Sequence, residues 1–140
     1  MILFENQTPI TLEISSLELI ANNETQKDIE LVLVDAKTIR EINKEFRGKD
    51  VSTDVLSFPL DEEMPYVPLG SIMINVELAT QKAKELGHSF QDEVSLLFIH
   101  GLLHILGYDH EVDNGGMRTK EEELILKYNL PKSLIIRTEG

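Results

Sequence analysis

The sequence contains no cysteine and no tryptophan, and aromatic residues make up only 6% of its 140 positions. The lack of cysteine excludes disulfide bridges and cysteine-ligated structural zinc, and it is compatible with a reducing compartment. The first residues show neither the basic segment nor the apolar run of a secretory signal, and no apolar-rich segment is long enough to cross a bilayer. We therefore expect a cytoplasmic protein that is not embedded in a membrane.

Positive charge is scarce, because 13 lysines and arginines face 25 aspartates and glutamates, a net charge of −12. This imbalance argues against indiscriminate binding to nucleic acid or to anionic membranes. A polyanionic partner would need a local basic patch. The two acidic runs, at residues 61–63 and 121–123, are expected to be solvated surface.

The fractions of hydrophobic and charged residues, 41% and 27%, are typical of a globular protein. No repeat or linker divides the chain. We predict one domain over residues 1–140. Strands are predicted at Ile10–Ile14, Ile29–Val34, Val55–Phe58, Gly70–Ile74 and Leu134–Arg137, with an acidic loop at Leu60–Pro68. Helices are predicted from Ser15 to Gln26, Asp35 to Gly48, Asn75 to Gly87, Ser89 to Leu106 and Met117 to Tyr128. This mixture favours a two-layer or three-layer α/β arrangement around one small sheet.

Two of the predicted helices have informative patterns. The helix ending at Leu106 is apolar on nearly all sides, which is typical of a helix in the core. The helix that Asp35 caps carries Ile39, Ile42 and Phe46 on one face, opposite its basic side chains.

Three of the four histidines lie between residues 100 and 110, in the pattern H-x-x-x-H-x-x-G-x-x-H formed by His100, His104 and His110. Histidines four apart share one face of a helix, whereas His110 can join them only if the helix stops. Gly107 makes this possible, because glycine readily adopts the left-handed conformation that ends helices. Three converging imidazoles with a fourth position open are what a zinc-type ion needs. We therefore predict that these histidines bind a metal ion.

The histidine spacing matches that of metzincin peptidases, but Gly101 stands where those enzymes carry their general-base glutamate. A peptidase is therefore not favoured, although a bound metal can still activate water or polarise a substrate. We expect Asp109 to orient a metal-binding histidine, Met117 to be a core residue and His88 not to be a ligand.

A basic stripe lies upstream, where Lys37, Arg40, Lys44 and Arg47 are spaced three, four and three apart on a predicted helix. Residues 37–49 contain five basic and two acidic side chains, a local charge of 5 − 2 = +3. Most such stripes are ordinary solvated helix faces. Arg47 differs because it ends the helix beside Gly48, where its fork of donors is suited to a phosphate.

Three segments of the chain resemble the YbeY family of bacterial endoribonucleases and rRNA maturation factors. Asn43 to Pro59 matches its N-x-x-x-R and T-D-V-L-S-F-P block, Leu69 to Ile72 its L-G-D-I strand, and His100 to His110 its H-G-x-L-H-L-x-G-Y-D-H signature. The resemblance spans about residues 29 to 126. The chain departs from the pattern at Ser71, where the family usually has aspartate, and at Ile105, where it has leucine.

The resemblance implies a single α/β (α+β-like) domain with a small mixed sheet and a largely buried central helix that carries the histidines. It implies one zinc ion on His100, His104 and His110, and a functional role for Arg47. The implied activity is cleavage of single-stranded RNA during maturation of the 16S rRNA precursor and ribosome quality control. The expected partners are that RNA, bound through a local basic patch, and the ribosome or small-subunit proteins.

Two alternatives stay open. The first alternative is a non-catalytic ribosome assembly factor whose three-histidine metal site stabilises the fold. The second alternative is a metzincin-like hydrolase that cleaves a bond other than those of RNA. Gly101 argues against this alternative, because it stands where such enzymes have glutamate.

Overall fold

The computed structural model describes residues 1–60, 68–108 and 116–131. Four strands form one sheet in the order β1-β2-β4-β3. Their bounds are β1 Ile2–Asn6, β2 Ile29–Val34, β3 Val55–Pro59 and β4 Gly70–Asn75. β2 runs parallel to both β1 and β4, whereas β3 runs antiparallel to β4. The sheet is therefore small and mixed, as the resemblance implied.

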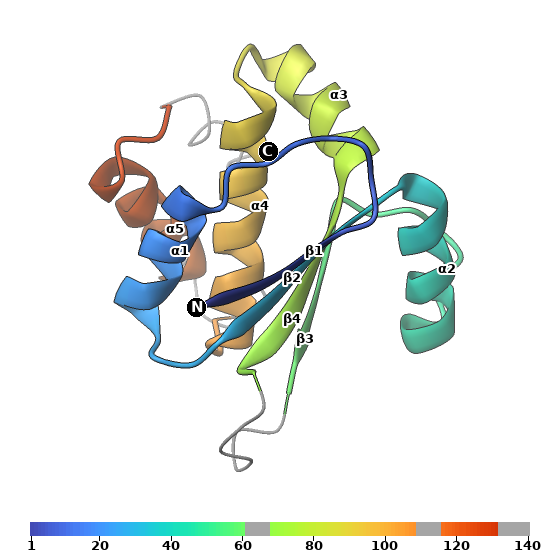
Figure 1. Ribbon diagram of the computed structural model, residues 1–140, viewed down its shortest axis with the longest axis horizontal. Helices are drawn as coiled ribbons and strands as arrows, with labels where there is room; N and C mark the ends of the chain where they lie inside the picture. The colour runs from blue at the N-terminus through green and yellow to red at the C-terminus, as the bar shows by residue number, and fades with distance from the viewer. Residues whose placement is uncertain (61–67, 109–115, 132–140) are drawn as a thin grey trace.

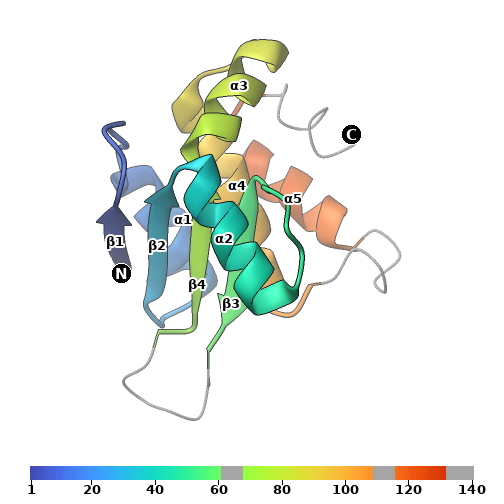
Figure 2. The same cartoon turned by 90° about the vertical axis from the view of Figure 1, so that its right-hand side faces the viewer.

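Helices cover the sheet on both faces. Their bounds are α1 Ser15–Glu24, α2 Ala36–Arg47, α3 Val76–Leu86, α4 Phe90–Ile105 and α5 Gly116–Lys127. α4 lies between the sheet and the pair α1 and α5, while α2 lies alone on the opposite face (Figures 1 and 2). The main hydrophobic core joins α4 to the sheet, α1 and α5, and a second cluster lies under α2. This confirms the prediction of a central buried helix.

Two glycines allow α4 to lie close to β4. A Cβ atom at Gly101 would lie 3.0 Å from Cγ2 of Ile72, and one at Gly70 would lie 2.6 Å from Cδ1 of Ile105. Side chains at these positions would push the helix away from the strand. Gly101 therefore faces the sheet, and its lack of a side chain helps to set the depth at which α4 packs.

The predicted helix caps are largely confirmed. The side chains of Asp35, Asn75 and Ser89 accept hydrogen bonds from backbone N–H groups in the first turns of α2, α3 and α4. The hydrogen bonds from Thr38 lower the pKa of Asp35 below its usual value. The predicted cap at Ser15 is wrong, because Ser15 lies within α1 and Ile14 occupies the N-cap position without a side-chain bond.

The N-terminal strand was assigned to the wrong residues. Residues 10–14 are not a strand, and the edge strand is instead β1, which pairs with β2 from Ile2 to Asn6. Asn6 turns the chain after β1, donating from Nδ2 to the carbonyl of Ile10 and accepting from the backbone N–H of Thr8. The alternation at residues 10–14 reflects a connection that buries Leu12 over the core. The proposed strand at 134–137 and most of the loop at 60–68 lie outside the described residues.

The apolar face of α2 is only partly covered. Ile39 is buried and Ile42 packs against the cluster under α2, but Phe46 is 67% exposed. The last turn of α2 therefore leaves part of its apolar face uncovered. Among the described residues, no helix has both the length and the apolar character needed to span a membrane.

Candidate metal centre

His100 and His104 lie one turn apart on α4, and their rings face each other. The two Nε2 atoms are 3.1 Å apart, and the ring planes meet at 77°. Two nitrogen ligands about 2.0–2.1 Å from a tetrahedral zinc ion lie about 3.3 Å from each other. The two nitrogen atoms therefore have nearly the separation that a shared zinc ion requires.

A buried glutamate holds the other nitrogen of His100. Nδ1 lies 2.7 Å from Oε1 of Glu121, whose side chain is 2% exposed. A carboxylate contact at Nδ1 favours the tautomer of His100 that carries its hydrogen on Nδ1 and leaves the Nε2 lone pair open toward His104. This carboxylate–histidine arrangement is common around metal-binding histidines, where it fixes the ring and raises its basicity.

Glu121 corrects the expectation that residues 121–123 are all solvated surface. Glu123 is exposed, but Glu121 is buried together with Met117 and Leu124 on the face of α5 that packs on the core. The signal was available in the helical period, since positions 117, 121 and 124 share one face. Met117 is fully buried, which confirms it as a core residue.

The segment after α4 turns at Gly107, whose φ of 103° is in the region that favours glycine. The backbone N–H groups of Gly107 and Tyr108 bond back to the carbonyls of His104 and Leu103. This confirms the predicted end of the helix at Gly107. His110 itself and Asp109 lie outside the described residues, and within the described ranges no three potential metal ligands come together.

A cavity of about 250 Å³ joins the two histidines to Arg47. Its walls are formed by Arg47, Thr53, Asp54, Val55, Ser57, His100 and His104. Arg47 donates from Nη2 to the carbonyl of Ser57 at 3.0 Å, and its guanidinium carbon lies 5.6 Å from the ring centre of Phe58. The end of α2, strand β3 and helix α4 thus meet at one edge of the sheet.

The other basic side chains of the stripe are placed differently. Arg40 binds Asp50 through Nε at 2.9 Å, and this hydrogen bond and the positive charge of Arg40 lower the pKa of the carboxyl group. Arg40 is not among the residues that line the cavity. Arg47 is therefore the member of the stripe that lies with the histidines.

His88, the remaining histidine, belongs to a different part of the structure. Its Nε2 atom lies 2.8 Å from Oε1 of Glu93, and both side chains are buried at the junction between α3 and α4. This contact joins the start of α4 to the turn before it.

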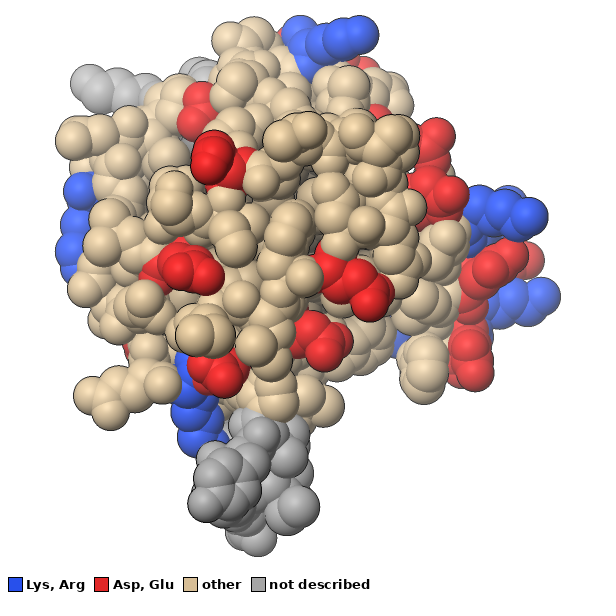
Figure 3. Space-filling model, viewed as in Figure 1, with Lys and Arg blue, Asp and Glu red and all other residues tan. Residues whose placement is uncertain are grey.

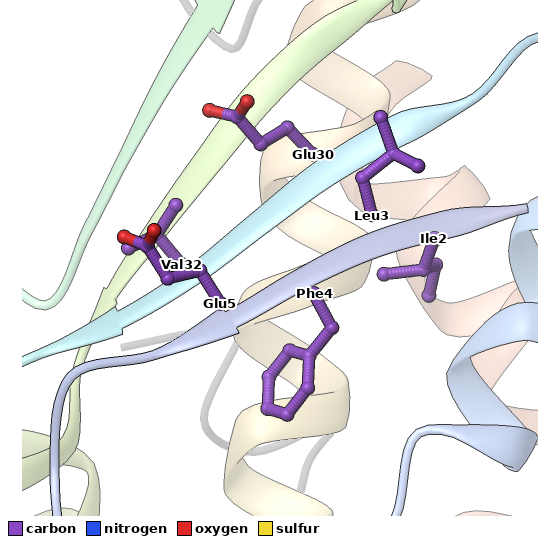
Figure 4. A pocket seen from close by; sticks show the side chains of 6 residues that line it. All are labelled: Ile2, Leu3, Phe4, Glu5, Glu30 and Val32. Atoms are coloured by element: carbon purple, nitrogen blue, oxygen red, sulfur yellow. The ribbon is translucent and has the colours of Figure 1, made fainter.

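A second hollow, about 520 Å³, lies at the opposite edge of the sheet along β1 and β2. Leu3, Glu5, Glu30 and Val32 point to one side of the strands, whereas Ile2 and Phe4 point toward the helices (Figure 4). Acidic side chains are spread over the face of the molecule seen in Figure 3, and lysines and arginines lie mainly at its margin.

Ser71 lies on the same face as this second hollow. Its Oγ donates to Oε1 of Glu30 at 2.9 Å. The next residue, Ile72, faces Gly101 of α4, so Ser71 must face the opposite side of the sheet. The departure from the family pattern at Ser71 therefore leaves the histidine pair unchanged.

Comparison with known proteins agrees with the sequence motifs. The family model described as Endoribonuclease YbeY matches residues 5–129. The chain belongs to the YbeY family. It is 59% identical to Endoribonuclease YbeY of Nautilia profundicola, with 99% of each chain covered, and 57% identical to that of Helicobacter pylori strain 26695, again with 99% covered. The YbeY protein of Campylobacter jejuni strain 81-176 is 62% identical over 89% of this chain and 92% of its own.

The fold has a solved counterpart. The solution structure of TM1509 from Thermotoga maritima superposes with a TM-score of 0.63 at 30% identity, covering 91% of this chain and 89% of the other. This similarity supports the mixed α/β fold that the sequence predicted for a YbeY family member.

Proposed function

We propose that this protein is a zinc-dependent endoribonuclease that cleaves single-stranded RNA. One observation carries the proposal: two histidine Nε2 atoms lie 3.1 Å apart in a cavity that also contains Arg47. The names of the relatives, Endoribonuclease YbeY, supply the reaction class. Family membership further supports a role in 16S rRNA maturation and ribosome quality control in the cytoplasm, with the ribosome or small-subunit proteins as partners.

His100, His104 and His110 are the proposed metal ligands, and one zinc ion is the proposed cofactor. Zinc in such a site supplies Lewis acidity toward a phosphoryl oxygen and lowers the pKa of a coordinated water. Glu121 accepts the Nδ1 hydrogen of His100 and so keeps Nε2 available for binding. Glu121 is itself buried, so this contact from α5 to α4 is shielded from water on the carboxylate side.

Arg47 is the proposed catalytic residue. A guanidinium group carries five donors in a planar fork that fits two phosphate oxygens. The bond to Ser57 and the Phe58 ring hold this fork at the cavity wall. In this proposal Arg47 binds a phosphate next to the histidines and stabilises the negative charge that grows on it during cleavage.

The proposed activity is tested with the purified chain, single-stranded RNA and a gel assay. Zinc-loaded wild-type protein should cleave the RNA, and a chelator should abolish cleavage until zinc is restored. His104→Ala, prepared in parallel, should be inactive. Equal trace cleavage by the wild type and by His104→Ala would identify a contaminating nuclease and contradict the proposal.

The second candidate is an assembly factor whose metal mainly stabilises the fold. The observation in its favour is that Glu121 and His100 join α5 to the central helix, so metal binding there would also secure α5. A melting temperature that falls sharply on zinc removal, in a protein with no detectable RNA cleavage, would favour this role over catalysis.

Peptide hydrolysis of the metzincin type is opposed by the position of Gly101. A side chain there would meet Ile72 rather than extend into the cavity. A glutamate at this position would crowd Ile72 on the sheet side of α4.

A further inference from the structure

Phe46 is exposed in a way that packing does not explain. It is 67% exposed, and it is the single aromatic residue among the exposed large hydrophobic side chains of the described residues. Its recorded ring contact is with the ring of Phe58, at 6.0 Å between centres and 64° between planes. An edge contact of this kind supports the ring while leaving much of its surface open to solvent.

The surroundings of Phe46 connect it to the cavity. The Phe58 ring that supports Phe46 also lies 5.6 Å from the Arg47 guanidinium carbon, and Arg47 lines the cavity with His100 and His104. The exposed ring of Phe46 and the guanidinium group of Arg47 are therefore neighbours, and both contact the Phe58 ring.

The positive charge beside Phe46 comes from Arg47, which shares the Phe58 ring with it. The other basic side chains of α2 lie on the opposite side of the helix from Phe46, and Arg40 is paired with Asp50. A guanidinium group next to an open aromatic ring is an arrangement by which proteins bind single-stranded nucleic acids, with a phosphate on the charge and a base on the ring.

We propose that Phe46 is a stacking platform for an unpaired RNA base next to the phosphate that Arg47 binds. This inference rests on the proposed function and deepens it, because it gives a physical source for the preference for single strands. A base in a duplex is stacked between its neighbours and cannot offer its face to Phe46, whereas an unpaired base can.

The test measures RNA affinity by fluorescence anisotropy, using the full chain and a short labelled single strand, with RNA integrity checked on gels. Phe46→Ala should weaken binding by about tenfold to a hundredfold, the range expected from losing one stacked base. Phe46→Trp should keep the affinity, and Phe46→Leu should lose it, because leucine is apolar but has no flat ring. Leu126→Ala, which removes an exposed leucine from α5, is the matched control and should bind as the wild type does.

A second arm uses RNA in which single bases are removed one position at a time. At the position that stacks on Phe46, base removal should weaken wild-type binding and should have no further effect on Phe46→Ala. The inference is overturned if Phe46→Leu binds like the wild type, or if Phe46→Ala loses equal affinity for intact RNA and for every abasic RNA. It is also overturned if the wild type binds and cleaves RNA and every Phe46 variant does so equally, which leaves the proposed function intact. Failure of the wild type to bind or cleave single strands would instead contradict the proposed function itself.

Discussion

The two edges of the sheet each carry a hollow, and the two hollows are lined by different kinds of side chain. At the β3 edge, the cavity of about 250 Å³ brings together Arg47, His100 and His104 from α2 and α4. At the β1 edge, the hollow of about 520 Å³ is lined by aliphatic and aromatic side chains together with Glu5 and Glu30. The larger hollow is lined by two carboxylates and no basic side chain, whereas the smaller one sets the guanidinium group of Arg47 and two imidazoles beside a single carboxylate, Asp54.

This difference shows why volume alone does not locate a functional site. The β3 cavity is lined by α2, β3, α4 and the two residues before β3, and two of its side chains, His100 and Arg47, are held by neighbouring groups. Glu121 holds His100, and Ser57 and Phe58 hold Arg47. Groups held in this way are preorganised for binding and chemistry. The predictions below test whether function resides at the β3 edge.

Replacement of His104 should have the largest effect. His104→Ala removes one proposed ligand and leaves His100 without the nitrogen that lies 3.1 Å away. We expect zinc content after purification to fall from about one ion per chain to background, and RNA cleavage to fall with it. Atomic absorption and the gel assay measure the two quantities. Retention of full zinc content would show that His104 is not a ligand.

Replacement of Arg47 should separate metal binding from cleavage. Arg47→Ala should keep its zinc and lose roughly a hundredfold to a thousandfold in kcat, as for the loss of one charge-stabilising donor. Arg47→Lys should recover only part of this loss, because lysine has the charge without the fork.

Arg40→Ala is the matched control for this prediction, since Arg40 lies on the same helix but pairs with Asp50 and does not line the cavity. It should cleave RNA nearly as well as the wild type. A loss of zinc in Arg47→Ala, or equal losses of activity in both variants, would contradict the assigned role of Arg47.

Much of this edge could be predicted from the sequence, because its signals are local. The spacing of His100 and His104, the turn at Gly107 and the caps of α2, α3 and α4 depend on neighbouring residues, and the structure has each of them. The family resemblance indicated a functional role for Arg47. The position of Arg47 beside the histidines depends on how α2 and α4 meet around β3, and the spacing of residues in the sequence does not predict it.

The errors have the opposite character, because long-range packing decides them. Glu121 was grouped with its acidic neighbours, although a partner 21 residues earlier in the chain holds it in the core. β1 was missed because its pairing with β2 stabilises a short N-terminal segment that has little alternation of its own.

Glu121 provides the next test, of intermediate size. Glu121→Gln keeps the size of the side chain but removes the carboxylate that accepts the Nδ1 hydrogen of His100. We expect zinc affinity, measured by competition with a chelator, to fall by roughly tenfold to a hundredfold. Nitrogen NMR of the His100 ring should show the Nδ1–H form in the wild type and a mixture of forms in the variant.

Glu123→Gln is the matched control for Glu121, since it removes an exposed carboxylate from the same helix. Its zinc affinity should equal that of the wild type. If Glu121→Gln lowers the melting temperature of the zinc-free protein but leaves the zinc affinity and the His100 ring unchanged, Glu121 only secures α5.

The smallest effect is expected at the other edge of the sheet. Glu5→Gln removes a charge from the β1 hollow. The Glu5 carboxylate accepts a hydrogen bond from the side chain of Gln7, and its strand is at the opposite edge of the sheet from β3. A surface change of this kind alters free energies by about 0.5 kcal/mol or less, so kcat/KM for RNA cleavage should change by no more than about twofold. Steady-state cleavage rates with labelled single-stranded RNA measure this directly. A tenfold change would mean that RNA also contacts the β1 edge, and the contrast between the two hollows would then describe two parts of one binding surface.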